Sequence, residues 1–317
     1  MVDLSEERIV VTGGAGFLGR HVIAALRVAG WAEEQIVAPP HAEWDLLDSP
    51  ALARVFAIVS PSLVVHLAGV VGGIGANRAN PGRFCYENLH MGLNVIEAAR
   101  RAGCVRKLLV VGTTCSYPKW APVPLHESDL WLGYPEETNA PYGLAKRMLL
   151  VMLQGYRQQY GLHGAYLIPA NLYGPGDNCD PATSHVIPAM IRKFSEAKRD
   201  GLPDVELWGT GAASREFLHV RDCARAIVLA LEKYDSPEPV NIGTGQEITI
   251  GTLAHAIRRL SGYEGEIVWD ASKPDGQPRR CLDVSKAKAE FGFEATVKLE
   301  DGLRETIDWY NNTRTNP

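Results

Sequence analysis

The sequence has no apolar run that approaches the roughly 20 residues needed to cross a bilayer, and its N-terminus lacks a basic segment followed by an apolar one. It also has no dense run of Lys or Arg, and its formal net charge is -5. Such a chain presents no electrostatic footprint for nucleic acid or for an anionic membrane surface. We therefore expect a cytoplasmic protein that binds neither, although a small anionic ligand would need only a few well-placed cations.

Cysteine pairs with CxxC spacing are absent, and so are Cys/His combinations with metal-ligand spacing. Scattered cysteines in a reducing compartment favour free thiols, so we expect no structural zinc and no other metal site. The cysteines are Cys85, Cys104, Cys115, Cys179, Cys223 and Cys281. The composition, with 46% hydrophobic and 22% charged residues, is typical of a folded enzyme and excludes a disordered or fibrous chain.

Short β-branched apolar runs alternate with longer stretches of helical periodicity in the first half of the chain. The runs that predict strands are residues 8–12, 35–38, 62–67, 107–111 and 164–168. The stretches that predict helices are residues 21–28, 49–60, 84–103 and 142–160. Strands that are apolar on both faces and separated by helices imply a parallel sheet covered on both sides. The sequence therefore predicts an α/β fold with a doubly wound parallel sheet.

The pattern loosens after residue 175, where Gly and Pro become frequent. The segment WGTGAASREFLHV, residues 208–220, predicts a hairpin. EIVWD at 266–270 and TVKL at 296–299 predict further short strands, and we expect residues 240–242 to return to the first sheet.

Glycines recur directly after the first predicted strand, in GGAGFLG at residues 13–19. Gly13 allows a sharp turn, Gly16 lets the backbone approach a pyrophosphate, and Gly19 lets the helix pack closely on the strand. The N-terminus of the helix then offers free N–H groups and the positive end of its dipole to the phosphates. The GxxGxxG spacing in this place predicts a dinucleotide-binding site of the Rossmann type.

The glycine-rich turn suggests a division of labour along the chain. We expect residues 1–174 to form an NAD(P)-binding Rossmann domain, to which segments near 215–245 return. Residues 175–317 are then expected to form mainly a smaller α/β domain that binds the substrate.

No carboxylate follows the second predicted strand, where an NAD-binding domain usually offers an Asp or Glu to the adenosine ribose. The sequence there reads APPHAEW, and Glu43 is the first acidic residue. Nothing at the strand end would repel a 2'-phosphate, and Arg20 and His41 are the nearby cations that could meet it. The sequence therefore favours NADPH over NAD.

Tyr142 and Lys146 lie four residues apart in PYGLAK, so one turn of the predicted helix places them on the same face. The strand at 107–111 ends in a hydroxyl-rich turn that contains Thr113. When a hydride reaches a ketone carbon, the oxygen must receive a proton, and a phenol can supply it. We expect Lys146 to lower the pKa of Tyr142 and to hold the nicotinamide ribose, while Thr113 bonds the carbonyl oxygen.

Several narrower segments occur along almost the whole chain. They are VGGIGANRANPGRF, GTTCSYPK, PYGLAK, PANLYGPGDN, SHVIPA, WGTG, REFLHV, NIGTG and DASKPDGQPRR. On these segments the chain resembles the GDP-L-fucose synthase family of the extended short-chain dehydrogenase/reductase superfamily. The resemblance implies NADPH-dependent conversion of GDP-4-keto-6-deoxy-D-mannose to GDP-L-fucose by 3,5-epimerisation and 4-keto reduction. The chain departs from the family at Thr113, where Ser is usual, and at Ala15, where many members carry an Arg that meets the 2'-phosphate.

The resemblance also implies that Cys115 and His185 are the base and acid pair at C3 and C5 of the sugar. Protons beside a ketone are acidic enough for a weak base when the enolate is stabilised. The predicted catalytic residues are Thr113, Cys115, Tyr142, Lys146 and His185. The predicted cofactor-binding residues are Gly13, Gly16, Phe17, Leu18, Gly19, Ala68, Gly69, Tyr142, Lys146, Pro169, Ala170, Leu172 and His185. The residues predicted to bind the GDP-linked sugar are Asn171, Lys193, Trp208, Arg215, Asp275 and Arg280.

Other hypotheses stay open. One is a related GDP-sugar enzyme, either a reductase without epimerisation acting on a hexose or heptose, or a synthase of GDP-colitose. Another is a redox-neutral NAD-dependent epimerase, and a third is a non-catalytic dinucleotide sensor on the same fold. The helices at 84–103 and 142–160 could form a homodimer, although a buried core would show the same apolar periodicity.

Overall fold

The computed structural model describes residues 7–273 and 275–315. Some residues that the predictions include lie outside the described residues. They are the first six and last two residues of the predicted domain ranges, and Pro274 of the DASKPDGQPRR segment. A six-stranded sheet in the order β2-β1-β3-β4-β5-β9 forms the larger part of the molecule, and all its neighbouring strands are parallel. Its strands are β1 (Ile9–Thr12), β2 (Ile36–Val37), β3 (Leu63–His66), β4 (Lys107–Val111), β5 (His163–Pro169) and β9 (Pro239–Ile242). The predicted doubly wound α/β fold is confirmed.

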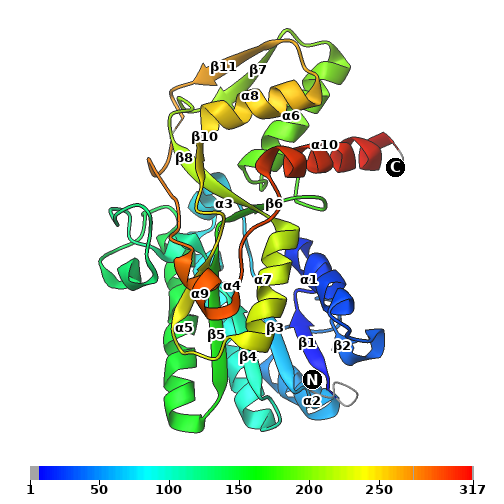
Figure 1. The fold of residues 1–317 in the computed structure, drawn as a ribbon, viewed down its shortest axis with the longest axis vertical. Helices are drawn as coiled ribbons and strands as arrows, with labels where there is room; N and C mark the ends of the chain where they lie inside the picture. Colours follow the sequence, from blue (N-terminus) through cyan, green and yellow to red (C-terminus); the bar gives the residue numbers. More distant parts are fainter. Residues whose placement is uncertain (1–6, 274, 316–317) are drawn as a thin grey trace.

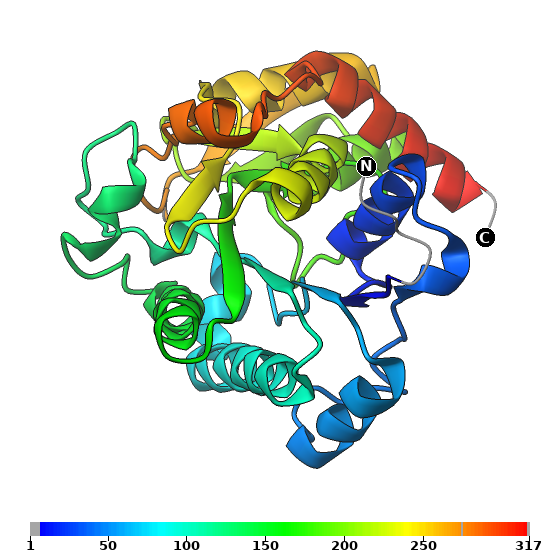
Figure 2. The ribbon, with the colours of Figure 1, turned by 60° about the horizontal axis from the view of Figure 1, so that its bottom comes forward.

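Helices cover both faces of this sheet (Figure 2). On one face α4 packs against both α2 and α5, and on the other α1 packs against α7. Their bounds are α1 (Phe17–Val28), α2 (Ser49–Val59), α4 (Pro81–Ala102), α5 (Ala140–Tyr160) and α7 (Val220–Lys233). Every residue of β1, β3 and β9 is buried, because a strand covered on both faces has no side that meets water.

A second, smaller group of elements lies beyond one end of the sheet and is seen at the top of Figure 1. It contains a three-stranded sheet in the order β10-β8-β6 and a two-stranded parallel sheet of β11 and β7. The strands are β6 (Asn171–Tyr173), β7 (Asp204–Trp208), β8 (Ser214–His219), β10 (Glu247–Thr249) and β11 (Glu266–Asp270). Helices α6 (Val186–Asp200), α8 (Ile250–Ser261) and α10 (Leu299–Thr315) contribute to a separate hydrophobic cluster around Phe194 and Leu253.

The hairpin predicted for residues 208–220 is wrong. The chain does turn there, through Gly209 and Gly211 at positive φ, but β7 pairs with β11 whereas β8 pairs with β6 and β10. The Gly209 N–H donates to Asp270 O (2.9 Å), and Asp275 holds the next residue, Thr210. The turn is thus fastened to residues 270–275 and cannot close its own two strands on each other.

The strand predicted for residues 296–299 is also wrong. The N–H groups of Thr296 and Val297 donate to the carboxylate of Asp222, each at 2.8 Å, so they are not available to a ladder. Leu299 then begins α10. The strand predicted at 266–270 is confirmed as β11, and residues 240–242 do return to the first sheet as part of β9.

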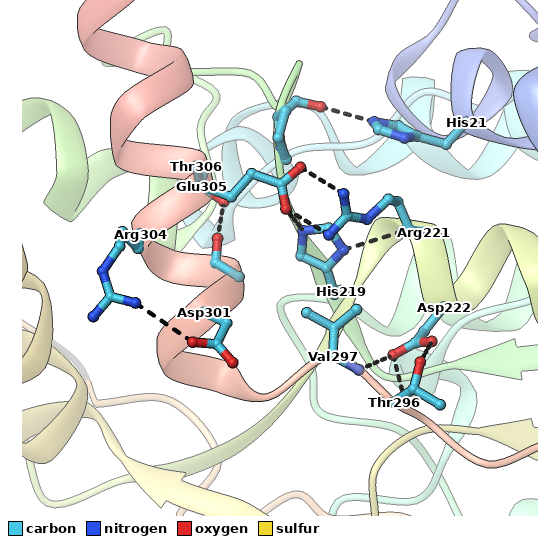
Figure 3. A network of polar contacts seen from close by, with 12 residues as sticks. His21, His219, Arg221, Asp222, Thr296, Val297, Asp301, Arg304, Glu305 and Thr306 are labelled. Carbon is cyan, nitrogen blue, oxygen red and sulfur yellow. Dashed lines mark hydrogen bonds and ion pairs between the residues drawn. The ribbon is translucent and has the colours of Figure 1, made fainter.

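A polar network joins the start of α7 to the C-terminal helix (Figure 3). Arg221 forms an ion pair with Glu305 of α10 (2.6 Å), whose other contact is the buried His219 at 3.8 Å. Burial opposes the ionisation of Asp222, but bonds from Val297, Arg225 and Thr296 outweigh it and lower the pKa of Asp222. Three segments of the second half, the start of α7, residues 296–297 and α10, are therefore tied together by polar contacts.

None of the helices within the described residues is long and apolar enough to cross a membrane. The six cysteines all lie in the described part of the chain and all are free thiols, as predicted.

Candidate active site

The carboxyl ends of the parallel strands meet at one edge of the sheet, where ligands bind in open α/β folds. The strand register pairs Thr12 with His66, and Val111 with Leu167 of β5. The glycine turn, the loop after β3 and the turn with Thr113 all start from this edge.

The glycine turn packs directly against the loop after β3. Gly13 has a φ of +73°, and a Cβ there would lie 2.8 Å from Ala68 N. A Cβ at Gly19 would overlap the carbonyl oxygen of Gly13, so α1 starts as close to the turn as backbone allows. Gly16 caps α1 with no side-chain hydrogen bond, and the first turn contains no acidic residue. The amides and the dipole of α1 are therefore left for an anion.

The end of β2 carries no carboxylate that reaches this turn. A Cβ at Gly14 would lie 2.6 Å from the Cβ of Ala38, so Gly14 of the turn packs directly against Ala38 after β2. His41 and Glu43 are exposed, and Arg20 donates to Gly176 O at 3.1 Å. Arg20 is thereby attached to the segment after β6.

Tyr142 and Lys146 occupy the first two turns of α5, and the side chains of Tyr142 and Thr113 share a hydrogen bond. The Phe84 ring of α4 packs edge-on against the Tyr142 ring, with centroids 6.4 Å apart. Burial raises the pKa of Tyr142, and the neighbouring Cys115 adds to the rise, whereas the bond to Thr113 lowers it. The expectation that Lys146 lowers the pKa of Tyr142 is wrong for the described chain, because burial outweighs any attraction between them. The phenol is held in its protonated form.

Lys146 is only 3% exposed, and burial lowers its pKa to about 8. Its ammonium reaches the loop after β3, since a Cβ at Gly69 would lie 3.4 Å from Lys146 Nζ. His66 is also near: burial and the charge of Lys146 lower the pKa of His66 to about 3. The neutral His66 ring is fixed by a 2.8 Å hydrogen bond between its Nδ1 and Thr12 Oγ1.

Two further residues support this region and were not predicted from the sequence, His66 and Asn88. Asn88 donates to Val70 O (2.9 Å) and accepts from Val70 N (3.1 Å), which clamps the loop that carries Gly69. The sequence did contain one signal, because Asn88 is a polar residue within the apolar periodicity of α4. In the structure its side-chain amide is fully buried. A polar residue in that position needs a partner, and here the partner is loop backbone.

Cys115 lies in the turn that carries Thr113, and its N–H donates to Thr113 Oγ1 at 3.1 Å. A Cβ at Gly143 would overlap Cys115 O, so the turn presses on α5 between Tyr142 and Leu144. Ser116 Oγ adds a bond to Gly143 O (2.8 Å). The turn and the Tyr142 helix therefore form one rigid unit.

His185 is the N-cap residue of α6, it is exposed, and its side chain forms no capping hydrogen bond. Partial desolvation nevertheless lowers the pKa of His185. The residues before it contact the loop after β3, because Gly73 N donates to Thr183 O at 3.2 Å. That loop also passes Phe84, the ring that packs on Tyr142, so it connects the His185 segment to the Tyr142 helix.

Two arginines predicted for the substrate lie close to the Cys115 turn. Arg280 donates from Nη1 to Cys115 Sγ at 3.7 Å. Arg215 donates from Nη1 to Ser214 O (2.7 Å), and burial followed by the charge of Arg280 lowers its pKa to about 10. Arg280 was expected to bind the GDP-linked sugar, and its place against a sulfur was not predicted.

The other predicted substrate residues lie around these arginines and along β7. Asp275 accepts from the N–H and hydroxyl of Thr210 (both 2.7 Å), so its carboxylate fastens a turn. Lys193 donates to Glu206 O of β7 at 2.6 Å. Trp208, at the end of β7, is 58% exposed, and Asn171 donates to Glu216 O at 3.0 Å. Within residues 7–273 and 275–315, no group of three or more His, Cys, Asp or Glu could hold a metal ion.

A glycine turn at a helix N-terminus, a Tyr-Lys pair one helical turn apart and a hydroxyl bonded to the Tyr define a dinucleotide-dependent oxidoreductase or epimerase. The model of the "NAD dependent epimerase/dehydratase family" matches residues 9–243, and the chain belongs to this family. Over 303 residues it is 44% identical to GDP-L-fucose synthase 1 of Arabidopsis thaliana, covering 96% of this chain and 93% of that protein.

Two further likenesses extend over nearly the full length. GDP-L-colitose synthase of Yersinia pseudotuberculosis is 35% identical over 311 residues, with 98% of this chain and 99% of that protein covered. The crystal structure of a GDP-L-fucose synthetase from Naegleria fowleri bound to NADP superimposes with a TM-score of 0.87 at 28% identity, covering 100% of this chain and 97% of that one. The resemblance to GDP-L-fucose synthases predicted from sequence segments is thereby confirmed.

Proposed function

We propose that the protein converts GDP-4-keto-6-deoxy-D-mannose to GDP-L-fucose with NADPH, by epimerisation at C3 and C5 and reduction at C4. One observation carries the proposal: the protonated Tyr142 shares a hydrogen bond with Thr113, while Cys115 lies in the same turn. A proton donor for a ketone oxygen and a thiol for the adjoining carbons are thus held in one rigid unit.

In the reductive step, bound NADPH supplies the hydride to C4. Tyr142 gives its phenolic proton to O4 as negative charge develops there, and Thr113 donates a hydrogen bond that orients the same oxygen. The buried Lys146 holds the nicotinamide ribose beside Gly69.

In the epimerisation steps, Cys115 and His185 work as a pair. The base takes the proton from the carbon beside the ketone, the C–H electrons move to O4 as an enolate, and the acid returns a proton to the opposite face of that carbon. Tyr142 and Thr113 stabilise the enolate oxygen. This assignment follows the family resemblance, and it is supported by the contact of the Cys115 turn with α5.

The dinucleotide is proposed to lie along the carboxyl edge of the sheet. Its pyrophosphate meets the N-terminus of α1 at Gly13, Gly16 and Gly19, with Phe17 and Leu18 beside it. Ala68, Gly69, Pro169, Ala170, Leu172 and His185 complete the proposed cofactor set. A synthetase with NADP bound is among the similar structures, and β2 ends without a carboxylate, so NADPH is preferred over NAD.

The GDP-linked sugar is proposed to lie on the other side, toward the smaller group of elements. Arg215 is suited to the diphosphate, because it is half-buried and its guanidinium forms no ion pair within the described residues. Lys193 and Trp208 would lie farther along the nucleotide, with Asp275 holding the turn beside them and Asn171 near the sugar. This assignment goes with the proposed division into a dinucleotide unit, residues 1–174 with segments near 215–245, and a mainly sugar-nucleotide unit, residues 175–317.

The test is incubation with GDP-4-keto-6-deoxy-D-mannose and NADPH, followed by NMR of the product. We expect one NADPH consumed per product and a sugar inverted at C3 and C5. A product formed without net NADPH consumption would favour a redox-neutral epimerase, and a product reduced without inversion would favour a plain reductase.

A second candidate is GDP-L-colitose synthesis, favoured by the likeness to the Yersinia pseudotuberculosis enzyme over 98% of this chain. Parallel assays with the two keto sugars decide between them through the ratio of kcat/KM values. A higher value for the colitose precursor would make the fucose assignment wrong.

We further propose a cytoplasmic homodimer that pairs α4 and α5 with their copies. Apolar side chains on these helices are unusually exposed for a monomer: Tyr86 61%, Met148 51%, Val151 41% and Tyr160 47%. Light scattering is expected to give twice the chain mass, and Met148→Glu with Val151→Glu is expected to halve it. A wild-type monomer at micromolar concentration would contradict the dimer.

A further inference from the structure

The guanidinium of Arg280 occupies an unusual place for a cation. The residue is 9% exposed, and its Nη1 points at Cys115 Sγ, 165 positions earlier in the chain, at 3.7 Å. No Asp or Glu among the described residues forms an ion pair with Arg280. A buried charge without a counter-charge is costly, so the site favours any group that can become an anion beside it.

Gln277 holds this guanidinium in position. Its Oε1 accepts from Arg280 Nη2 (2.8 Å) and Nε (3.3 Å), which leaves Nη1 directed at the sulfur. The Nε2 of Gln277 donates to Lys119 O (3.0 Å), only four residues past Cys115. The 277–280 segment is therefore tied to the turn that carries the thiol.

The two cations that interact with this thiol, Arg280 and Arg215, both favour negative charge there. Arg280 and Arg215 are both cationic and close enough to repel each other, and Arg215 also interacts with Cys115. Tyr142 is neutral in its protonated form. The carboxylates of Asp275 and Glu136 act on Arg215. One guanidinium thus contacts the thiol, and a second interacts with it electrostatically.

We propose that Arg280 is a positioning residue for epimerisation, which aims the sulfur of Cys115 and stabilises its thiolate. This inference rests on the proposed function, because it gives the thiolate the role of base. The thiolate takes the proton from C3 or C5: the C–H bond breaks, an S–H bond forms, and the electron pair moves to O4. When the thiolate is protonated, Arg280 loses its counter-charge.

The experiment measures the rate of Cys115 alkylation by iodoacetamide against pH, read on the peptide that contains Cys115 by mass spectrometry. The free enzyme is used, so the reading needs no substrate. We expect Arg280→Gln to move the midpoint of the profile upward by about one pH unit or more, because an adjacent cation favours the thiolate. Arg280→Lys keeps a cation and is expected to restore much of the shift.

Arg279→Gln is the matched control, since Arg279 directly precedes Arg280 and its side chain instead pairs with Glu247 on the surface. It removes the same charge, and the profile should not move. Gln277→Glu provides a second route that leaves Arg280 in place: the new carboxylate pairs with the guanidinium, and the midpoint should again rise. An unchanged midpoint in both Arg280→Gln and Gln277→Glu would overturn the inference.

Solvent deuterium uptake into the keto sugar then separates this inference from the proposed function. We expect Arg280→Gln to slow uptake by about tenfold with little change in KM. The reason is that a rise of about one pH unit in the alkylation midpoint corresponds to about tenfold less thiolate. A large rise in KM with an unmoved alkylation profile would assign Arg280 to the diphosphate and overturn the inference. A moved profile in an enzyme that never exchanges deuterium would instead refute the proposed epimerisation and leave the Arg280 contact standing.

Discussion

The two sides of the proposed site are built in different ways. On the sheet side, the glycine turn, Thr113 and Tyr142 follow directly from strands and helices that alternate along the chain. On the side of the smaller sheets, Arg215 comes from a short strand and Arg280 from a loop that crosses back to the Cys115 turn. Proton donation to a ketone therefore depends on local geometry, whereas the surroundings of the thiol depend on contacts between distant segments.

The strongest test of the local side is Tyr142→Phe. The change removes the proton donor alone, so we expect kcat for reduction to fall by about 10²- to 10⁴-fold. Dinucleotide binding, measured by fluorescence titration, should stay within about twofold, because Lys146 and the glycine turn remain. Turnover at the wild-type rate would place the acid elsewhere.

The corresponding test of the thiol side is Cys115→Ser. A serine hydroxyl is a far weaker acid than a thiol, so uptake of solvent deuterium at C3 and C5 should fall by about 10²-fold. Burst reduction of a keto sugar that has already been epimerised should proceed. Unchanged exchange would remove Cys115 from the mechanism and with it the contrast between the two sides.

Gly143→Ala breaks the junction where the two sides meet. The new Cβ overlaps the carbonyl oxygen of Cys115, and backbone cannot give way cheaply. We expect a loss of about 1–3 kcal/mol in the free energy of unfolding, measured in urea, and a fall of both activities together. Gly82→Ala in α4 is the control: its Cβ meets nothing within 4 Å, so the free energy of unfolding should change by at most about 1 kcal/mol, as a gain.

Asp222→Asn tests the second half without touching the site. The folded-state pKa of Asp222 is lowered, so its stabilisation is present at neutral pH and is lost as pH falls through that lowered value. We expect a loss of about 1–3 kcal/mol at pH 7, and a smaller difference from wild type below about pH 4. Asp301→Asn, at an exposed ion pair with Arg304 of α10 (Figure 3), should cost less than about 0.5 kcal/mol. Equal losses in urea melts would contradict this ranking.

Much of the sheet could be predicted, because each strand is a short apolar run with a helix on either side. Lys107–Val111 was placed to the residue, and the other predicted strands of the first half agree within one or two positions. The failures lie in the second half. A glycine turn between two strands at 208–220 suggested a hairpin, but local turn residues do not reveal which strands pair, and residues 270–275 hold that turn from outside.

The supports of the site were harder to predict than its reactive groups. A phenol and an ammonium one helical turn apart leave a pattern in the sequence, because both belong to one helix. Asn88 leaves only a weak trace, and the contact of Arg280 with Cys115 leaves none, since nothing local to either residue indicates the other.

The sequence by itself determined the alternation of strands and helices, the glycine turn, and the Tyr142 and Lys146 pair, because each depends on residues within one or two turns of chain. Only the tertiary structure decided that burial raises the pKa of the Tyr142 phenol and that a guanidinium faces the thiol. Burial and charge pairing depend on which distant segments pack together, and that packing belongs to the folded chain as a whole.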